Sequence, residues 1–170
     1  MKTKKTAILI LVLAIIGLVV LTACGGGSAG GGGTVSPTWI NPVLASNTVS
    51  VLVSDVEKYT MTHFKVNMPL EGQNYDLPFM TYKLGNQFYA RANVCVPCGS
   101  ESFTLDKDKL VCDSCGTIFD AKTGNGVSGV PACKNYPKAS VAYKIENGNV
   151  VMDKEALLKA LTDTLEPGLP

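Results

Sequence analysis

The sequence contains a single histidine, His63, and a single tryptophan, Trp39, among its 170 residues. One histidine cannot build a histidine-rich metal site, and the setting Thr62-His63-Phe64 is typical of an ordinary strand residue. No nucleophile elbow is present, and the glycine-rich stretch lacks the lysine of a phosphate-binding loop. The sequence therefore gives no support to a serine hydrolase or a nucleotide-binding enzyme.

An excess of charge of either sign is also missing. The chain has 15 basic and 14 acidic residues, and 12 basic residues remain once the three lysines of residues 1–5 are set aside. A chain so close to neutrality has no basic patch for nucleic acid and no strong electrostatic attraction to anionic lipid. We therefore expect no nucleic-acid partner, and we expect attachment to a membrane to depend on a lipid.

The first 24 residues indicate export and lipidation. A basic head, an apolar run over residues 7–23 and small residues before Cys24 are the features of an export signal. Leu21-Thr22-Ala23-Cys24 resembles the lipobox of bacterial lipoproteins, in which the cysteine becomes the lipid-modified first residue. We predict a signal peptide over residues 1–23 and a lipid anchor on Cys24, and the alternative is an uncleaved transmembrane anchor. Both interpretations place the rest of the chain outside the cell membrane.

A glycine-rich segment, residues 25–33, follows the anchor. Such a composition cannot bury apolar surface and is typical of a flexible linker. We predict a tether over residues 24–47 and one folded domain over residues 48–170, which is an ordinary domain length.

Short strands dominate the predicted domain. Alternating or β-branched segments predict strands at residues 48–53, 62–68, 77–82, 87–94, 103–105, 109–111, 140–145 and 149–152. Ser54-Asp55-Val56-Glu57 has the spacing of a capping box and predicts a helical turn. Residues 153–165 have helical spacing, with Asp153 as N-cap and an apolar face of Ala156, Leu157, Ala160, Leu161 and Leu165. These elements predict a mainly β fold, a small antiparallel β domain with a C-terminal helix.

Five cysteines remain beyond Cys24, and four of them form two repeated motifs. Cys95-Val96-Pro97-Cys98-Gly99 and Cys112-Asp113-Ser114-Cys115-Gly116 each place two sulfurs on a tight turn closed by glycine. Glycine adopts the positive φ that turns backbone N–H groups toward the sulfurs. Two such turns facing each other make a tetrahedral sulfur site that suits zinc or iron.

Three alternatives to an iron site remain open at this stage. Two structural disulfides would suit an oxidising compartment, although a disulfide within one Cys-x-x-Cys turn is strained. A thioredoxin-type redox site requires a helix after the motif, and neither motif opens a good helix. A structural zinc site is the strongest alternative, because an all-sulfur donor set does not distinguish zinc from iron.

The second motif continues into a pattern that resembles a known cluster-binding loop. Residues 112–124 resemble the second loop of Rieske proteins, with Phe119-Asp120 and Thr123-Gly124 in the expected places. Cys98 and Cys115 stand where Rieske proteins carry histidine, and the first loop is one residue longer. A closer resemblance, over roughly residues 64–152, is to the FtrD-like membrane iron–sulfur family, including Pro131-Ala132-Cys133 after the two motifs.

These resemblances imply Rieske- or rubredoxin-like knuckles that hold an iron–sulfur cluster of the [2Fe–2S] type or a single iron, with zinc as the alternative. The expected metal ligands are Cys95, Cys98, Cys112 and Cys115, and Cys133 is a possible extra ligand. The implied function is electron transfer outside the membrane, linked to iron uptake or respiration, with another membrane redox or transport protein as partner. The alternatives are a structural zinc domain that binds a membrane partner and a carrier that releases its metal.

Overall fold

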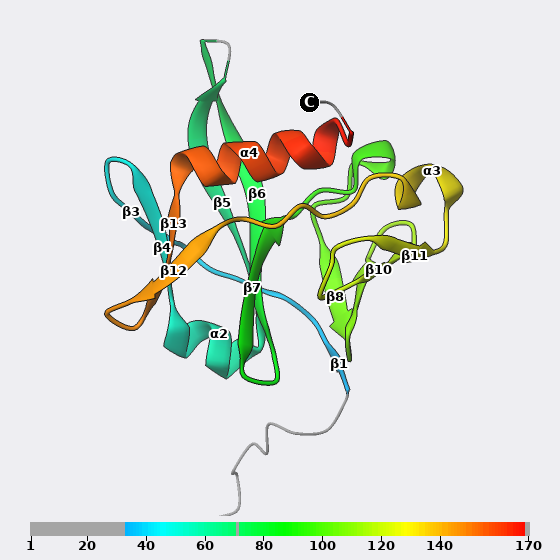
Figure 1. Cartoon of the computed structure of the whole chain (residues 1–170), viewed down its shortest axis with the longest axis horizontal. Coiled ribbons are helices and arrows are strands. Elements are labelled where there is room, and N and C mark those ends of the chain that lie inside the picture. Colours follow the sequence, from blue (N-terminus) through cyan, green and yellow to red (C-terminus); the bar gives the residue numbers. More distant parts are fainter. Residues whose placement is uncertain (1–32, 71, 169–170) are drawn as a thin grey trace, which may run out of the picture. The chain divides into compact units, whose positions relative to one another are not determined.

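A computed structural model describes residues 33–70 and 72–168 of the chain. The predicted signal peptide and Cys24 lie outside these residues. The elements, labelled in Figure 1, are β1 (Thr34–Val35), β2 (Thr38–Trp39), β3 (Val43–Leu44), β4 (Thr48–Leu52), α2 (Val53–Tyr59), β5 (Met61–Leu70), β6 (Gln73–Leu84), β7 (Gln87–Ala92), the 3-10 turn η1 (Val96–Cys98), β8 (Phe103–Asp106), β9 (Lys109–Cys112), β10 (Ile118–Asp120), β11 (Gly126–Ser128), α3 (Pro131–Lys134), β12 (Tyr143–Glu146), β13 (Asn149–Asp153) and α4 (Lys154–Leu165).

Three small sheets are built from these strands. Their orders are β1-β8-β9-β10-β11, β12-β13-β4-β3 and β2-β5-β6-β7. All pairs are antiparallel except β2 with β5, which run parallel. The mainly β, antiparallel fold with a C-terminal helix is therefore confirmed. In the described part of the chain, no helix is long and apolar enough to cross a membrane.

The sheet of β5, β6 and β7 lies between two hydrophobic cores. In Figure 1, β4, β12 and β13 lie on one side of this sheet, and β8, β10 and β11 lie on the other. Successive strand residues point to opposite faces, so Phe79 enters one core and Met80 the other. The first core lies among β4, β13, α2, α4 and this sheet, and consists of Val49, Val51, Val56, Phe64, Val66, Met68, Leu77, Phe79, Ala90, Ala92, Val141, Val150, Met152, Leu157, Ala160 and Leu161. The cysteine core lies on the other face and consists of Met61, Met80, Tyr82, Cys95, Phe103, Leu105, Leu110, Cys112, Phe119, Ala121 and Cys133.

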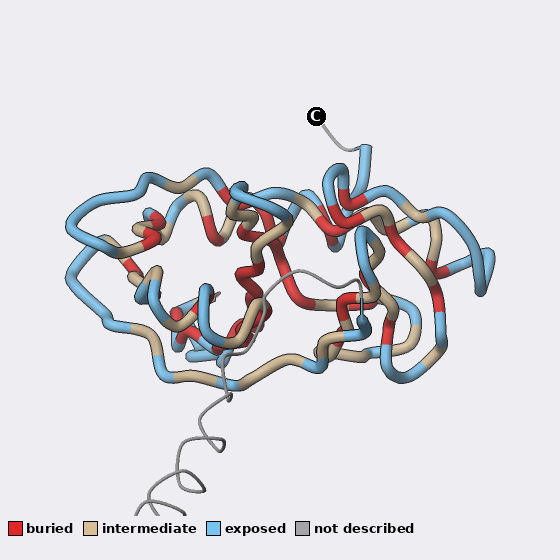
Figure 2. The backbone as a smooth tube through the Cα atoms, turned by 90° about the horizontal axis from the view of Figure 1, so that it is seen from below, coloured by how far each residue is buried: buried red, intermediate tan, exposed pale blue. Residues whose placement is uncertain are grey.

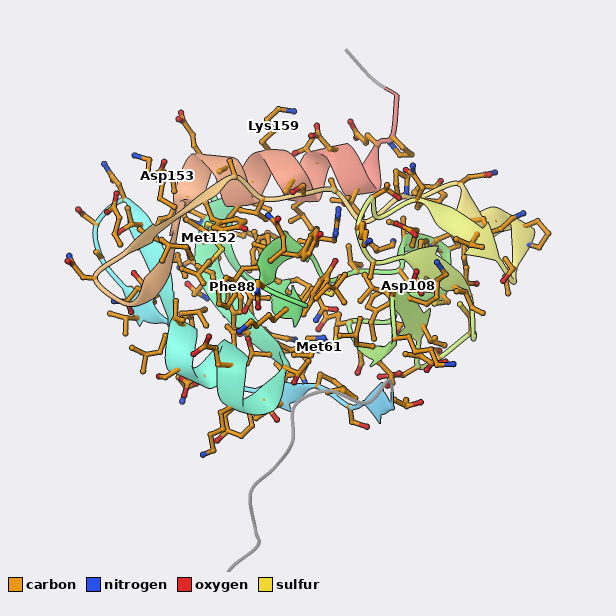
Figure 3. The ribbon with its side chains drawn as sticks, turned by 60° about the horizontal axis from the view of Figure 1, so that its bottom comes forward. Met61, Phe88, Asp108, Met152, Asp153 and Lys159 are labelled. Carbon is orange, nitrogen blue, oxygen red and sulfur yellow. The ribbon has the colours of Figure 1, made fainter. Side chains whose placement is uncertain are left out.

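Burial on both faces explains the composition of the central strands. Residues 77–82 are all buried, and a nearly continuous apolar run is what a strand covered on both sides requires. Figure 2 shows buried backbone in the interior of the molecule and exposed backbone around it. In Figure 3, Met152 and Phe88 mark the side of the first core, and Asp108 marks the cysteine-bearing side.

The folded part of the chain begins earlier than the predicted boundary at residue 48. Three two-residue strands, β1, β2 and β3, add to the edges of β8, β5 and β4, and Ile40 N–H donates to His63 O at 2.8 Å. The predicted tether over residues 24–47 is thus wrong for residues 34–44. Strands of two residues are too short to show the alternation by which a strand is recognised in sequence.

The helix signals were only partly correct. Helix α2 forms, but it begins at Val53 with Leu52 at the N-cap and no side-chain cap bond, so the capping box at Ser54 is wrong. Helix α4 follows Asp153 as predicted, again without a side-chain cap bond. Leu165 is 42% exposed, whereas Thr164 is buried and its hydroxyl accepts a bond from Ala139 N–H at 2.9 Å.

Candidate metal centre

The first cysteine turn follows the end of β7. Cys95 N–H donates to Ser100 O at 2.7 Å, and Gly99 N–H donates back to Cys95 O at 2.8 Å. Gly99 has φ 70°, and a Cβ there would meet no atom within 4 Å. Glycine is therefore favoured here by the left-handed backbone and not by lack of space.

The second turn repeats this geometry at the end of β9. Cys112 N–H donates to Thr117 O and Gly116 N–H donates to Cys112 O, each at 2.9 Å, and Gly116 has φ 68°. The turn is also tied to β8, because the side chains of Ser102 and Thr104 both donate to the Asp113 carboxylate. Both predicted cysteine turns are thus present with the expected backbone.

The two turns bring four sulfurs together. The Sγ atoms of Cys95, Cys98, Cys112 and Cys115 all lie within 4.8 Å of one another. Two separations between the turns are 3.9 Å, from Cys95 to Cys115, and 3.7 Å, from Cys98 to Cys112. A tetrahedral ion with metal–sulfur bonds of about 2.3 Å needs sulfurs about 3.8 Å apart. The donor set therefore fits a tetrahedral metal ion, and cysteine sulfurs are also the ligands of iron–sulfur clusters.

No disulfide joins the five cysteines in the part of the chain that the structure describes. Cys95 and Cys112 are buried, whereas Cys98 and Cys115 are partly exposed. Phe103 and Phe119 pack edge to face, with ring centroids 5.8 Å apart, in the core that holds the buried pair. Phe119 therefore shields the buried pair of sulfurs from water. The centre is closed on its inner side and open to solvent at two sulfurs.

Cys115 carries the features of a stabilised thiolate. Its Sγ lies 3.1 Å from Thr117 Oγ1, and Val130 N–H donates to the same oxygen at 3.1 Å, which leaves the hydroxyl proton available for the sulfur. Burial opposes ionisation, but hydrogen bonds from the side chain and backbone of Thr117 and from neighbouring cysteines outweigh it and lower the pKa of Cys115 to about 6. Gly129 allows this approach, because a Cβ there would lie 2.6 Å from Thr117 Cα.

The pKa values of the two buried cysteines shift in the opposite direction to that of Cys115. Burial raises the pKa of Cys95, and it also raises the pKa of Cys112 although the N–H groups of Cys115 and Ser114 oppose the shift. Uncharged thiols suit this apolar surrounding, and thiolates there need a compensating positive charge. A metal ion supplies such charge, so the inner half of the site favours the loaded state.

Cys133 lies beside the group of four without belonging to it. It sits on α3, is buried, and its Sγ is 3.8 Å from Cys115 Sγ. The role of Cys133 as an extra ligand stays a prediction. Trp39 packs edge to face on His63, with ring centroids 5.2 Å apart, but is itself 46% exposed, and Tyr136 is partly buried.

Sequence reasoning missed three residues of this region, Thr117, Arg91 and Lys138. Arg91 is the only arginine of the chain and donates from β7 to Tyr82 Oη and to three backbone carbonyls. Lys138 is completely buried beside the cysteine core. Arg91 could have been singled out in the sequence because it is the sole arginine. No local sequence pattern indicates that a lysine such as Lys138 is buried.

His63 provides a pH-dependent test of the fold. It is fully buried with both ring nitrogens unpaired, and burial lowers its pKa to about 4, although the charge of Asp113 acts in the other direction. The unfolded chain, with a histidine pKa near ~6.5, binds a proton first as pH falls. We expect this residue to remove stability between pH ~6.5 and ~4, by up to ~1.4 kcal/mol per pH unit and about 3 kcal/mol in total.

Urea unfolding of wild type and His63→Phe at several pH values measures this effect, because contributions common to both proteins cancel. The wild type should lose stability relative to the variant as pH falls through this window. Parallel pH profiles for the two proteins would contradict the assignment of a buried neutral imidazole.

Fold and site together define a small, mainly β protein with a four-cysteine site for a metal or an iron–sulfur cluster. The sequence profile of a family described as membrane iron-sulfur containing protein FtrD-like matches residues 56–163, and the chain belongs to this family. The predicted resemblance is thus confirmed. A search of curated proteins found no match.

A search of solved structures found chains that match part of this chain. A chain in a complex of reduced oxygenase and oxidized ferredoxin in carbazole 1,9a-dioxygenase is 24% identical with a TM-score of 0.48, covering 64% of this chain and 94% of that chain. The ferredoxin of carbazole 1,9a-dioxygenase from Nocardioides aromaticivorans IC177 is 14% identical with a TM-score of 0.43, covering 66% and 97%. A ferredoxin of Sphingomonas yanoikuyae B1 is 19% identical with a TM-score of 0.38, covering 53% and 84%.

Proposed function

We propose that this protein is an electron carrier held at the outer face of a cell membrane, with an iron centre bound by Cys95, Cys98, Cys112 and Cys115. The observation that carries the proposal is the convergence of four cysteine sulfurs within 4.8 Å in a member of a membrane iron–sulfur family. An iron centre bound there supplies one-electron oxidation and reduction.

The surrounding residues would contribute insulation and access. Phe103, Phe119 and Leu110 keep water from the inner side, because each is fully buried. Cys98 and Cys115 are partly exposed and provide the short route by which an electron passes to a partner. Every ligand position of a tetrahedral ion is taken by cysteine, which favours electron transfer over substrate binding at the metal.

The attachment and partners belong to the same proposal. Lipidation of Cys24 would hold the folded domain near a membrane redox or transport protein, and electron delivery there would serve iron uptake or respiration. Mass spectrometry of the membrane-bound protein should find a chain that begins at Cys24 and carries acyl groups on this residue. A chain that still contains residues 1–23 and carries no acyl group would contradict the lipid anchor and favour the uncleaved apolar segment.

The first test is a visible absorption spectrum with iron, zinc and sulfide counts, on residues 32–170 purified without oxygen, since these residues form one compact unit. We expect visible bands with iron, and two iron and two sulfide ions per chain would indicate a [2Fe–2S] cluster. Such an all-cysteine cluster should have a reduction potential near roughly −400 mV, as in plant-type ferredoxins. A potential well above zero would contradict that cluster assignment.

A structural zinc domain that binds a membrane partner is the second candidate. It is favoured by the mutual proximity of the four sulfurs, which suits one tetrahedral ion. A colourless protein with one zinc per chain would support this candidate and overturn electron transfer.

A further inference from the structure

Lys138 occupies an unusual position for a lysine. Its side chain is completely buried, in the segment between α3 and β12. The ammonium donates one hydrogen bond to Val94 O at 2.7 Å, next to Cys95 in the chain. It also lies 4.6 Å from the ring centre of Phe119 and 5.7 Å from that of Phe103. The charged end of Lys138 therefore points into the cysteine core.

No carboxylate balances this charge. The ion pairs among the described residues involve Lys65, Lys83, Lys109 and Lys159, and none includes Lys138. A buried ammonium with a single carbonyl acceptor and two ring faces is costly, because these partners replace only part of its hydration. A fold retains such a group at low cost only when an anion shares its surroundings.

The anions available are the cysteine sulfurs. Burial lowers the pKa of Lys138 to about 8, and the negative charges of Cys95, Cys112, Cys133 and Cys98 act in the opposite direction. Val94, whose carbonyl accepts the hydrogen bond of the ammonium, precedes Cys95 in the chain, and the two rings beside the ammonium belong to the same core as Cys95 and Cys112. The ammonium and these sulfurs therefore share one low-dielectric surrounding, in which opposite charges attract strongly.

The backbone of Lys138 is held rigidly in this place. Its N–H donates to Gly124 O at 2.8 Å and its carbonyl accepts from Arg91 Nη1 at 2.7 Å. Gly124 has φ 82°, and a Cβ there would lie 2.1 Å from Lys138 O. The charge is thus positioned before any metal binds, so it need not reorganise when the charge of the centre changes.

We propose that Lys138 is the internal counter-charge of the cysteine centre, stabilising its loaded, anionic state and favouring its reduced form. This inference rests on the proposed function. Four thiolates around a divalent ion carry a net charge of −2, and so do four thiolates on two ferric ions bridged by two sulfides. Each one-electron reduction adds a negative charge to the centre, and a fixed positive charge nearby stabilises that product.

The test compares Lys138→Met, which keeps the length of the side chain without its charge, with Lys122→Met, the same change at an exposed lysine. In the loaded protein, Lys138→Met should lower the reduction equilibrium constant at least tenfold, equivalent to 59 mV for one electron. It should also speed removal of the metal by a chelator at least tenfold. In the metal-free protein, the same substitution should raise the urea midpoint of unfolding, because it removes a charge without a partner.

If Lys138 is a counter-charge, Lys138→Met weakens the loaded protein but stabilises the metal-free protein. If Lys138 only fills space, the substitution destabilises both. Lys138→Arg, which keeps the charge, should retain a potential closer to wild type than Lys138→Met does. Equal destabilisation of loaded and metal-free protein by Lys138→Met, or a potential and chelation rate matching those of Lys122→Met, would overturn the proposal. A colourless zinc protein would overturn the proposed function, and the chelation and unfolding measurements would still decide the role of Lys138.

Discussion

Cys112→Ser should abolish metal binding, whereas Cys133→Ala should leave the centre in place. Cys112 is buried in the cysteine core, and its Sγ lies 3.7 Å from Cys98 Sγ within the group of four. Serine is a poor donor for a soft metal ion, and three remaining sulfurs cannot complete the tetrahedron. Because a site of this kind also holds its loops together, the sheet of β8, β9 and β10 should lose protection from hydrogen exchange.

Metal content per chain, measured together with hydrogen exchange of the two core regions, checks this expectation. Cys133→Ala is the matched control, because Cys133 is equally buried and lies beside the group of four, with its Sγ 3.8 Å from Cys115 Sγ. Loss of the metal in both variants would show that Cys133 is a ligand. Full metal content in Cys112→Ser would contradict the four-cysteine site.

Arg91→Met should destabilise the folded chain by about 3 kcal/mol or more, among the largest effects of any substitution away from the cysteines. Arg91 lies on β7 and donates to Tyr82 Oη at 2.7 Å and to the carbonyls of Lys122, Thr123 and Lys138. Methionine fills a similar volume but leaves these acceptors without their donor. Unpaired buried carbonyls each cost about 1–3 kcal/mol.

Chemical denaturation of Arg91→Met and of Lys159→Met provides the measurement and its control. Lys159 forms an exposed pair with Asp163 at 2.7 Å, and such pairs contribute less than about 1 kcal/mol. Similar small losses of stability in the two variants would show that water replaces the hydrogen bonds of Arg91. Arg91 would then not be the residue that holds the turn at residues 121–124 to the central sheet.

The parts of the site that sequence predicted are local. Each cysteine turn is specified within five residues, including the glycine that adopts positive φ, so spacing alone identified Cys95 to Gly99 and Cys112 to Gly116. Hairpins such as β12 and β13 were recognisable for the same reason, because Asn147 and Gly148 supply the turn.

The parts that sequence missed depend on distant segments. Lys138 and Arg91 have polar side chains, and their burial results from carbonyls that other loops bring to them, such as Val94 O for Lys138. The capping box at Ser54 was wrong because α2 follows β4 directly and begins at Val53, whose N–H is bound by the distant Gly148 O, so that Ser54 lies inside the helix. The edge strand β2 is recognisable only through its partner β5.

Through the central sheet, metal binding at the cysteine centre affects the stability of residues that do not contact the centre. Because β5, β6 and β7 present one face to each core, the two halves should unfold as one cooperative unit. A metal that binds only the native chain adds RT ln(1 + [L]/Kd) to its stability, about 2.7 kcal/mol at a hundredfold excess over Kd. Helix α4, on the far side of that sheet, would share this gain. If the protein lies outside the cell membrane as proposed, the metal supply there would govern how long the whole chain survives proteolysis, and the abundance of the protein would itself report on that supply.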